Sequence, residues 1–592
     1  MGLLQKCCET YDYHAHLVGV FKEGKTPLIP IAHVLKNADV EVTVDRYGRF
    51  INAALVIEGD ESTIIPVTID SGGRTVNSVA HPLCDKLKYM LSSNVKDFEE
   101  YIEGLQRWSE SVYGSPKLSA ILTYLKSGTI EDDLYSCKVL SGVSSKDKNK
   151  EQGLFIRWRV EGLETNAECW LDQELFDSWT NYYLSTLNGD KGFCMVTGEE
   201  TFITENHPKN IITSKDGINA KFISANDKTN FTFRGRFVNI AEANTVGYVA
   251  SQKAHSVLSW QASRGYFIGG RIFMCWNPKG FVTPNPFESL GVYSKKNNET
   301  EYKNDLRKTL NGYKLDLPDN EDVIMASMEA VSKGRVSLIY YNELKASDFL
   351  ERIGNWYQTC YWINGKHGVQ SPTIYQIIRC AYGAERANSE KLVVDDNISK
   401  DNQQRLFKCI LDKMPIPYDM VRCLLLKASK PESYDRNKKY NYRELLFVAC
   451  AIIRKFLNDR SKKEEWTLSL DKDKVERSYL FGRLLAVFER VEEHACNFSE
   501  GRETNAIRMQ SAYCEKPFYY TNIIHNRLTP YFAKLSYGRR NYYRKLIGEI
   551  MGKIAECESR DLNKPLSETY LLGYYLQYND WNKYKEDNET EE

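Results

Sequence analysis

The chain has 592 residues, several times the usual length of one domain, so we expect two to four packed units. Its 79 Lys and Arg residues balance 79 Asp and Glu residues, which excludes nucleic-acid binding through a global positive field and leaves only local patches. The longest apolar run, Leu445–Ile453, is far shorter than the roughly 20 residues of a membrane-spanning helix, so we expect no membrane partner.

Residues 1–185 predict an N-terminal α+β domain. Alternating or β-branched runs over 29–35, 40–57, 63–69 and 154–162 indicate strands, with an antiparallel pair on either side of the turn within 40–57. Helical spacing is found over 83–91, 98–108 and 117–125. The lysine-rich segment 141–153 can bury little surface, so we expect it to be an exposed loop.

Residues 186–470 predict a mixed region that becomes increasingly helical. A strand is expected over 230–240 and a helix with an apolar stripe over 245–261. Helical patterns follow, among them 321–331 and 442–457. The middle of the chain should therefore join an antiparallel sheet to a group of helices.

Residues 471–592 predict an all-α bundle. Apolar residues recur at helical spacing over 479–495, and amphipathic segments cover 519–534, 541–557 and 566–578. The expected fold class is thus α+β: mixed N-terminal and middle regions with antiparallel sheet, then a C-terminal helical bundle.

Few residues point to catalysis. His14 and His16 are the one closely spaced histidine pair, and no HxxxH or CxxC partner accompanies them, so we expect no bound metal. No phosphate-cradling or dinucleotide-binding glycine motif is present, which argues against a nucleotide cofactor. Cys194 and His207 can be read as nucleophile and base, although a buried thiol and a turn histidine are the simpler reading. The fifteen cysteines form no CxxC pair, which favours a reduced, cytoplasmic location. From the motifs considered above, we expect a protein that is not an enzyme and needs no cofactor.

One basic patch lies on the strand expected over 230–240. Strand alternation places Arg234 and Arg236 on one face, and Lys253 follows on the polar side of the next helix. Two guanidinium groups so spaced can hold consecutive phosphates. The alternative is an ordinary half-buried strand with a polar outer face.

A second patch near the C-terminus combines four cations with three tyrosines. The cations are Arg539, Arg540, Arg544 and Lys545, and the tyrosines are Tyr537, Tyr542 and Tyr543. Such a cluster suits a single-stranded backbone whose bases stack on the tyrosines. The alternative is a solvated helix face with the tyrosines turned into the bundle core.

A third candidate follows two adjacent glycines, Gly72 and Gly73, which let a backbone approach a groove closely. Arg74 can hold a phosphate, and Thr75, Asn77 and Ser78 carry donors and acceptors suited to base edges. The alternative is a strand-to-helix turn with a polar cap.

Four separated blocks of the sequence resemble the large-subunit family of the type I-C CRISPR Cascade complex, over essentially the whole chain. The fourth block is the helical C-terminal end. The residues that carry the other three are Arg74, Thr75, Pro82, Asp85 and Tyr89, then Cys194, Thr197, Gly198, His207 and Pro208, then Lys253, Ala254, His255 and Trp260.

The resemblance implies a subunit of a crRNA-guided surveillance complex with a backbone subunit, an RNA-processing subunit and a small subunit. It also implies recognition of the protospacer-adjacent motif (PAM) in double-stranded DNA, unwinding, holding of the displaced strand and recruitment of a helicase-nuclease for antiviral defence. Motif readout is assigned to Arg74, Thr75, Asn77 and Ser78, and backbone contact to Arg234, Arg236, Lys253, Arg539, Arg540, Arg544 and Lys545. A metal-dependent nuclease and a pure assembly scaffold are the alternatives.

Overall fold

The computed structural model describes residues 2–74, 79–142, 145–189, 191–212, 217–224, 244–294, 298–332, 334–435, 438–461, 465–496, 503–557 and 561–589. By its internal contacts the chain forms two compact units, residues 1–281 with 322–343, and residues 282–321 with 344–592. Within the described ranges, no helix is long and apolar enough to cross a membrane. The division expected after residues 185 and 470 stays a prediction.

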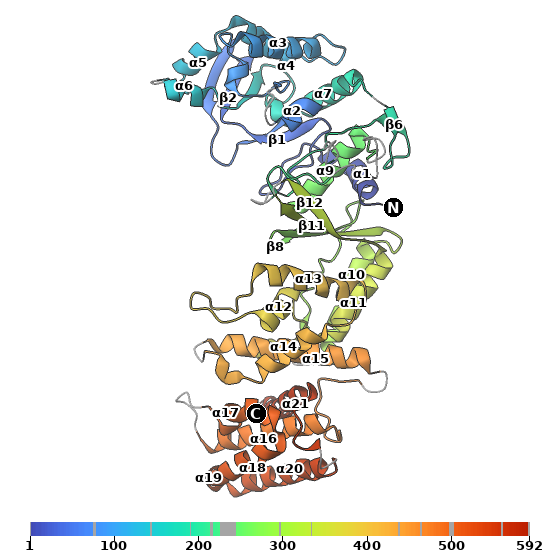
Figure 1. The fold of residues 1–592 in the computed structure, drawn as a ribbon, viewed down its shortest axis with the longest axis vertical. Helices are drawn as coiled ribbons and strands as arrows, with labels where there is room; N and C mark the ends of the chain where they lie inside the picture. The colour runs from blue at the N-terminus through green and yellow to red at the C-terminus, as the bar shows by residue number, and fades with distance from the viewer. Residues whose placement is uncertain are drawn as a thin grey trace, which may run out of the picture. The chain divides into compact units, whose positions relative to one another are not determined.

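The first unit begins with a three-stranded sheet and a separate two-stranded ribbon (Figure 1). The central strand β2 (Val40–Asp45) pairs antiparallel with β3 (Phe50–Leu55), as the sequence predicts, and parallel with β5 (Ile156–Glu161), which it does not. The ribbon joins β1 (His33–Asn37) to β4 (Ser62–Pro66). A parallel pair needs a long crossover, and helices lie between β3 and β5 along the chain.

Helices of this part of the unit match the predicted periodicity in some places and not in others. They are α2 (Ile69–Gly73), α3 (Val95–Ser109), α4 (Pro116–Ser127), α5 (Ile130–Ser136), α6 (Ser145–Glu151) and α7 (Gln173–Thr186). The helices predicted over 98–108 and 117–125 are confirmed as α3 and α4. The helix predicted over 83–91 is wrong, because only the 3-10 turn Leu87–Tyr89 forms there, and the expected loop 141–153 contains α6.

A second, four-stranded sheet completes the first unit. Its order is β12 (Arg335–Lys345), β11 (Asp322–Ser332), β9 (Arg271–Trp276) and β8 (Tyr266–Ile268). Two helices, α1 (Leu3–Tyr13) and α9 (Tyr248–Ala262), share a hydrophobic core with it, and a short hairpin joins β6 (Lys191–Phe193) to β7 (Glu200–Phe202).

The helix predicted over 321–331 is wrong: this segment is β11. Six successive residues, Val323–Met328, are buried there, so the strand is covered on both faces. A continuous apolar run of this kind does not distinguish a buried strand from a buried helix. The helix expected over 245–261 is confirmed as α9.

The second unit is almost entirely helical, with one small sheet of β10 (Tyr293–Ser294), β14 (Val369–Gln370) and β13 (Trp362–Ile363). Its helices are α10 (Glu299–Asp316), α11 (Ala346–Thr359), α12 (Ile374–Tyr382), α13 (Asp396–Leu411), α14 (Tyr418–Ala428), α15 (Lys439–Arg460), α16 (Arg477–Ala495), α17 (Asn505–Glu515), α18 (Pro517–Arg527), α19 (Thr529–Lys534), α20 (Tyr537–Ala555) and α21 (Thr569–Glu589). The predicted α+β class, with helices toward the C-terminus, is confirmed.

Two glycines let α16 and α21 pack unusually closely. A Cβ atom added to Gly482 would lie 1.9 Å from the carbonyl oxygen of Tyr570, and one added to Gly573 would lie 2.2 Å from that of Tyr479. Since each glycine faces the other helix's backbone, any side chain at either position would force the helices apart. The centre of the C-terminal bundle is therefore set by backbone contact as well as by the apolar stripe of α16.

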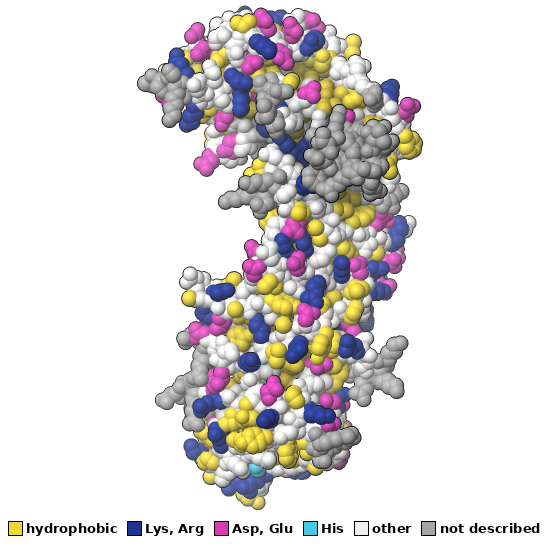
Figure 2. All heavy atoms as spheres, viewed as in Figure 1, with side chains coloured by type: hydrophobic (Ala, Val, Ile, Leu, Met, Phe, Trp, Pro, Cys, Tyr) yellow, Lys and Arg dark blue, Asp and Glu magenta, His cyan; other side chains and the backbone are white. Residues whose placement is uncertain are grey.

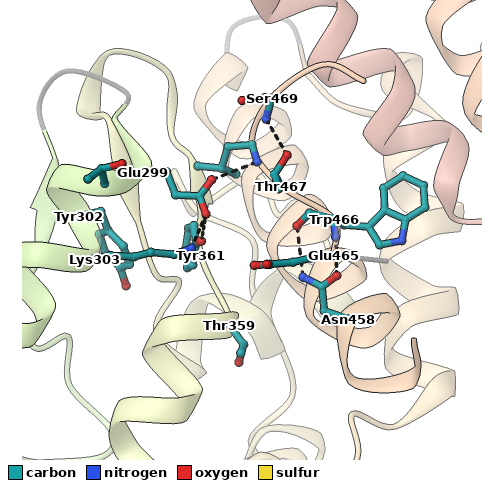
Figure 3. Close-up of polar contacts among 12 residues, drawn as sticks. Glu299, Tyr302, Lys303, Thr359, Tyr361, Asn458, Glu465, Trp466, Thr467 and Ser469 are labelled. Atoms are coloured by element: carbon teal, nitrogen blue, oxygen red, sulfur yellow. Dashed lines mark hydrogen bonds and ion pairs between the residues drawn. The ribbon is translucent and has the colours of Figure 1, made fainter. Parts of the chain in front are cut away.

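The connection from α15 to α16 is held by polar contacts, which Figure 3 shows around Glu299 and Asn458. Asn458 exchanges two hydrogen bonds with the main chain of Trp466, at 2.7 and 3.2 Å. The Leu468 amide donates to Glu299 of α10 at 3.3 Å, and Tyr361 donates to the other oxygen of Glu299 at 2.5 Å. The stretch 465–469 is thus fixed to α15 and α10 before the bundle begins.

Candidate nucleic-acid interface

The segment predicted to read DNA is anchored by a buried ion pair in the first unit. Arg74, at the C-terminal end of α2, donates two hydrogen bonds to Asp85, at 2.8 and 2.6 Å, and one to the carbonyl of Val79 at 2.8 Å. Asp85 has no exposed surface and also accepts the amides of His81 at 2.6 Å and Lys86 at 2.7 Å. Arg74 therefore ties together both ends of the segment 75–78.

Thr75, Asn77 and Ser78 lie outside the described residues, so their readout role stays a prediction. Arg74 is described, and its guanidinium group is engaged with Asp85 and stacked 5.4 Å from the ring centre of Tyr89. These contacts give Arg74 a positioning role at the base of the segment. They also give a structural reason for three residues of the first family block, Arg74, Asp85 and Tyr89.

The second family block forms a buried polar cluster. His207 donates from Nδ1 to Ser251 at 2.8 Å, and its Nε2 accepts from Asn244 at 2.7 Å. Burial lowers the pKa of His207 to about 3, and the neighbouring His255 and Lys221 add to the effect. Burial favours the neutral Cys194 thiol, but amides around it, Gly247 among them at 3.2 Å, lower its pKa overall. Both His207 nitrogens are thus used by Ser251 and Asn244, and the alternative pairing of Cys194 with His207 gains no support.

The described residues offer no set of side chains that could hold a metal ion. No three His, Cys, Asp or Glu side chains of the described residues come together as metal ligands would. His14 Nδ1 instead donates to the carbonyl of Thr10 at 2.8 Å, and the His14 ring packs on Trp260.

The basic patch predicted near the C-terminus lies at the surface of α18, α19 and α20, and we call it the α18–α20 surface. Residues 516–548 contain seven Lys or Arg residues and no Asp or Glu. Arg539, Arg544 and Lys545 are exposed on α20, and Figure 2 shows Lys and Arg side chains gathered at the lower end of the view, over the helices that Figure 1 labels α18, α19 and α20. A strand with negative charge would find few opposing carboxylates there.

The tyrosines of this patch divide between surface and core. Tyr537 and Tyr542 are 78% and 51% exposed, whereas Tyr543 is buried and hydrogen-bonded to His494 at 2.8 Å. The alternative, in which the tyrosines turn into the bundle core, is therefore correct for Tyr543 and wrong for Tyr537 and Tyr542. Tyr537 and Tyr542 thus present aromatic side chains at the surface of the same helix as Arg539 and Arg544, a combination suited to a single strand.

Arg540 differs from its neighbours because it caps the preceding helix. It donates to three carbonyls at the end of α19, those of Phe532 at 2.9 Å and of Ala533 and Leu535 at 3.1 Å. Its predicted backbone contact is not tested, but its substitution would disturb the turn from α19 to α20. Arg539 and Arg544 are therefore the cleaner positions for experiments.

The family described as CRISPR-associated protein (Cas_Csd1) matches residues 12–582, nearly the whole chain. The chain belongs to this family, the large subunit of the type I-C CRISPR Cascade complex. The resemblance carried by the four sequence blocks is confirmed. No curated protein matches the chain. As a member of the family, this large subunit takes part in a Cascade complex with crRNA and other CRISPR-associated subunits.

The remaining predicted contacts of the large subunit have different outcomes. Arg234 and Arg236 lie outside the described residues, so the basic strand stays a prediction. Lys253 on α9 forms an ion pair of 2.6 Å with Asp12 of α1 and lies 5.8 Å from the ring centre of Tyr11. Its charge is balanced within the fold, and strand holding by Lys253 remains a prediction.

Sequence reasoning missed a group of lysines near Arg74. Lys36, Lys86, Lys209 and Lys221 come from four separate segments of the sequence. Two signals were available: Lys86 directly follows Asp85 of the first family block, and Lys209 directly follows Pro208 of the second. Their proximity is a property of the tertiary fold.

Proposed function

We propose that this large subunit recognises the PAM in double-stranded target DNA, starts its unwinding, holds the displaced strand and recruits the helicase-nuclease, with no catalysis of its own. The observation that carries the proposal is the Arg74–Asp85 anchor at the base of the segment with Thr75, Asn77 and Ser78. Readout of a base edge requires donors and acceptors in fixed positions. A buried, bidentate ion pair that closes the segment at Val79 supplies such a fixed base.

The division of labour also fits a neutral protein. In a guide-RNA complex, base pairing with the crRNA selects the target, so the protein has to read only a short motif and hold backbones. Local patches suffice for this, and the net charge can be zero. The α18–α20 surface, with exposed arginines beside exposed tyrosines, has the chemistry to hold a single strand such as the displaced DNA strand.

The direct test is binding of the reconstituted complex, with and without this subunit, to guide-matched duplexes that differ only in the flanking motif. We expect motif discrimination and strand opening to disappear with the subunit. Within the subunit, Asn77→Ala should relax the motif preference by about 1–3 kcal/mol, the range of one good base-edge contact. If discrimination and opening both survive removal of the subunit, the protein is a scaffold at most.

The α18–α20 surface makes a separate prediction about salt dependence. The double variant Arg539→Gln/Arg544→Gln should weaken binding of single-stranded DNA by the complex and reduce the slope of log K against log salt by about 1.4, since each lost phosphate contact on a single strand accounts for about 0.7. The loss should be the same for every sequence tested.

A matched control for this variant is Lys308→Gln/Lys314→Gln on α10, which removes the same charge from exposed positions outside the patch. We expect the control to keep the wild-type slope. Equal slopes for wild type and the Arg539/Arg544 variant would remove the α18–α20 surface from the strand-holding role.

A further inference from the structure

Two lysines of the first unit face each other across a β-bridge. Lys209 and Lys221 are directly paired in an antiparallel bridge, and Lys221 is also bridged in parallel to Arg335 at the start of β12. The Lys221 amide donates to the carbonyl of Gly334 at 3.0 Å, and its carbonyl accepts from Val336 at 3.0 Å. Residues paired in this way project their side chains from the same face, about 5 Å apart at Cβ. Three cations therefore form a row on a fixed backbone.

Two further lysines lie near this row and near the Arg74–Asp85 pair. Lys36 is on β1, opposite Thr63 of β4, and Lys86 directly follows Asp85. Desolvation lowers the pKa of Lys36, and repulsion by Lys209, Arg74 and Lys86 lowers it further. The same two causes, burial and the charge of Lys209, lower the pKa of Lys221. Lys36 thus lies within reach of the charges of Lys86 and Lys209, and Lys221 within reach of the charge of Lys209.

Among the described residues, Asp85 is the carboxylate that opposes the lowering of the Lys36 pKa, and none opposes the lowering of the Lys221 pKa. In the part of the chain that the structure describes, no hydrogen bond or ion pair satisfies the ammonium group of Lys36, Lys86, Lys209 or Lys221. Asp85 is the carboxylate that acts on Lys36, and its oxygens already accept from Arg74, His81 and Lys86 amide. Like charges placed directly opposite each other cost stability unless something else compensates them.

A buried histidine lies beside the Arg74–Asp85 pair. His81 is almost completely buried, and neither ring nitrogen has a hydrogen-bond partner among the described residues. Burial lowers its pKa to about 3, and the charges of Arg74 and Lys36 lower it further against the opposing effect of Asp85. His81 is therefore neutral at pH 7, and the positive charge of this region comes from Arg74 and the lysines.

We propose that Lys36, Lys86, Lys209 and Lys221 form a phosphate-binding site, and that its ligand is the sugar-phosphate backbone of the target duplex beside the PAM. The inference rests on the proposed function, because it uses the closeness of the lysines to the Arg74–Asp85 anchor to choose duplex DNA over other polyanions. Lysine ammonium groups suit this task as point charges that tolerate varied phosphate positions. Such contacts fix the register of a duplex without reading its sequence.

The test uses Lys209→Gln/Lys221→Gln in the reconstituted complex, with guide-matched duplexes that carry or lack the motif, over a series of salt concentrations. We expect affinity to fall equally for both duplexes and the slope of log K against log salt to fall by about 1.8, or about 0.9 per lost duplex phosphate contact. Thermal stability should not fall, because the variant removes a repulsive pair. Lys209→Arg/Lys221→Arg should retain the slope, and Lys96→Gln/Lys126→Gln, exposed on α3 and α4, is the charge-matched control.

Three results would overturn the proposal. An unchanged slope means that the lysines do not bind the duplex backbone. Loss of crRNA retention with unchanged DNA binding assigns them to RNA, and loss of subunit assembly without nucleic acid assigns them to an acidic protein partner. Failure of this proposal is distinguishable from failure of the proposed function. The proposed function fails only if motif discrimination survives removal of the subunit. The lysine variant, in contrast, should leave unchanged the ratio of the affinities for the duplexes with and without the motif.

Discussion

Asp85→Ala should cost the first unit about 3–5 kcal/mol of stability and abolish motif discrimination. Asp85 is completely buried and accepts hydrogen bonds from Arg74, His81 and Lys86, so its loss leaves the Arg74 cation and two amides without their acceptor. Removing one partner of a buried ion pair costs this much because the other charge remains desolvated. Hydrogen exchange of the His81 and Lys86 amides gives a local measurement, and both should exchange faster.

A second variant separates stability from positioning. Arg74→Met/Asp85→Leu replaces the ion pair by apolar side chains, an exchange that is often neutral for stability when both partners change together. We expect it to recover the part of the stability that the unpaired Arg74 cation costs in Asp85→Ala, while the His81 and Lys86 amides still lack their acceptor. It should still fail in motif discrimination, because the link from Arg74 to the carbonyl of Val79 is gone. Motif discrimination equal to wild type in this stable double variant would show that the anchor is not needed for readout.

The helices that could be predicted from sequence are those with a strong one-sided stripe. In α3, Tyr101, Ile102, Leu105 and Trp108 recur at helical spacing and all are buried. The pattern is unambiguous because polar residues separate the apolar ones. β11 has no such separation: both of its faces are covered, so the period of two disappears and the run reads as a helix.

Local patterns also missed structure that depends on distant contacts. The segment 83–91 has helical spacing, but the Asp85 carboxylate accepts hydrogen bonds from Arg74 and from nearby amides. In addition, Trp158 and Tyr101 both donate to the carbonyl of Leu83. These tertiary contacts take the place of helical hydrogen bonds. The pairing of β2 with β5 is likewise set by residues more than a hundred positions apart.

The candidate sites show the same limit in another form. Runs of basic and aromatic residues located the α18–α20 surface, but they could not show that Arg540 caps α19 while Arg539 and Arg544 face solvent. The four members of the lysine site are brought together only by folding. A short stretch of sequence can reveal a patch whose residues lie on one helix. It cannot reveal a patch whose residues come from separate segments that pair only in the folded protein.

Arg454→Met should destabilise the second unit by about 3–5 kcal/mol and loosen the start of the C-terminal bundle. Arg454 is 1% exposed; it donates to the carbonyl of Trp466 at 2.6 Å, to that of Thr359 at 3.1 Å and to the Tyr361 hydroxyl at 2.9 Å. Its guanidinium group also lies 3.9 Å from Glu299 and 4.1 Å from the Tyr361 ring centre. Methionine fills much of the volume but leaves two buried carbonyls without their donor.

The expected local effect of Arg454→Met is faster hydrogen exchange at the Trp466 and Leu468 amides, which donate to Asn458 and Glu299. Arg454→Lys is the matched control: it keeps the charge but not the planar fork, so it should recover only part of the stability. Wild-type exchange at both amides in Arg454→Met would show that Asn458 and Glu299 hold the connection without the arginine. Because α16 follows this connection directly and packs against α20, a loosened connection should also weaken single-strand binding by the α18–α20 surface, while the salt slope, which counts phosphate contacts, stays the same.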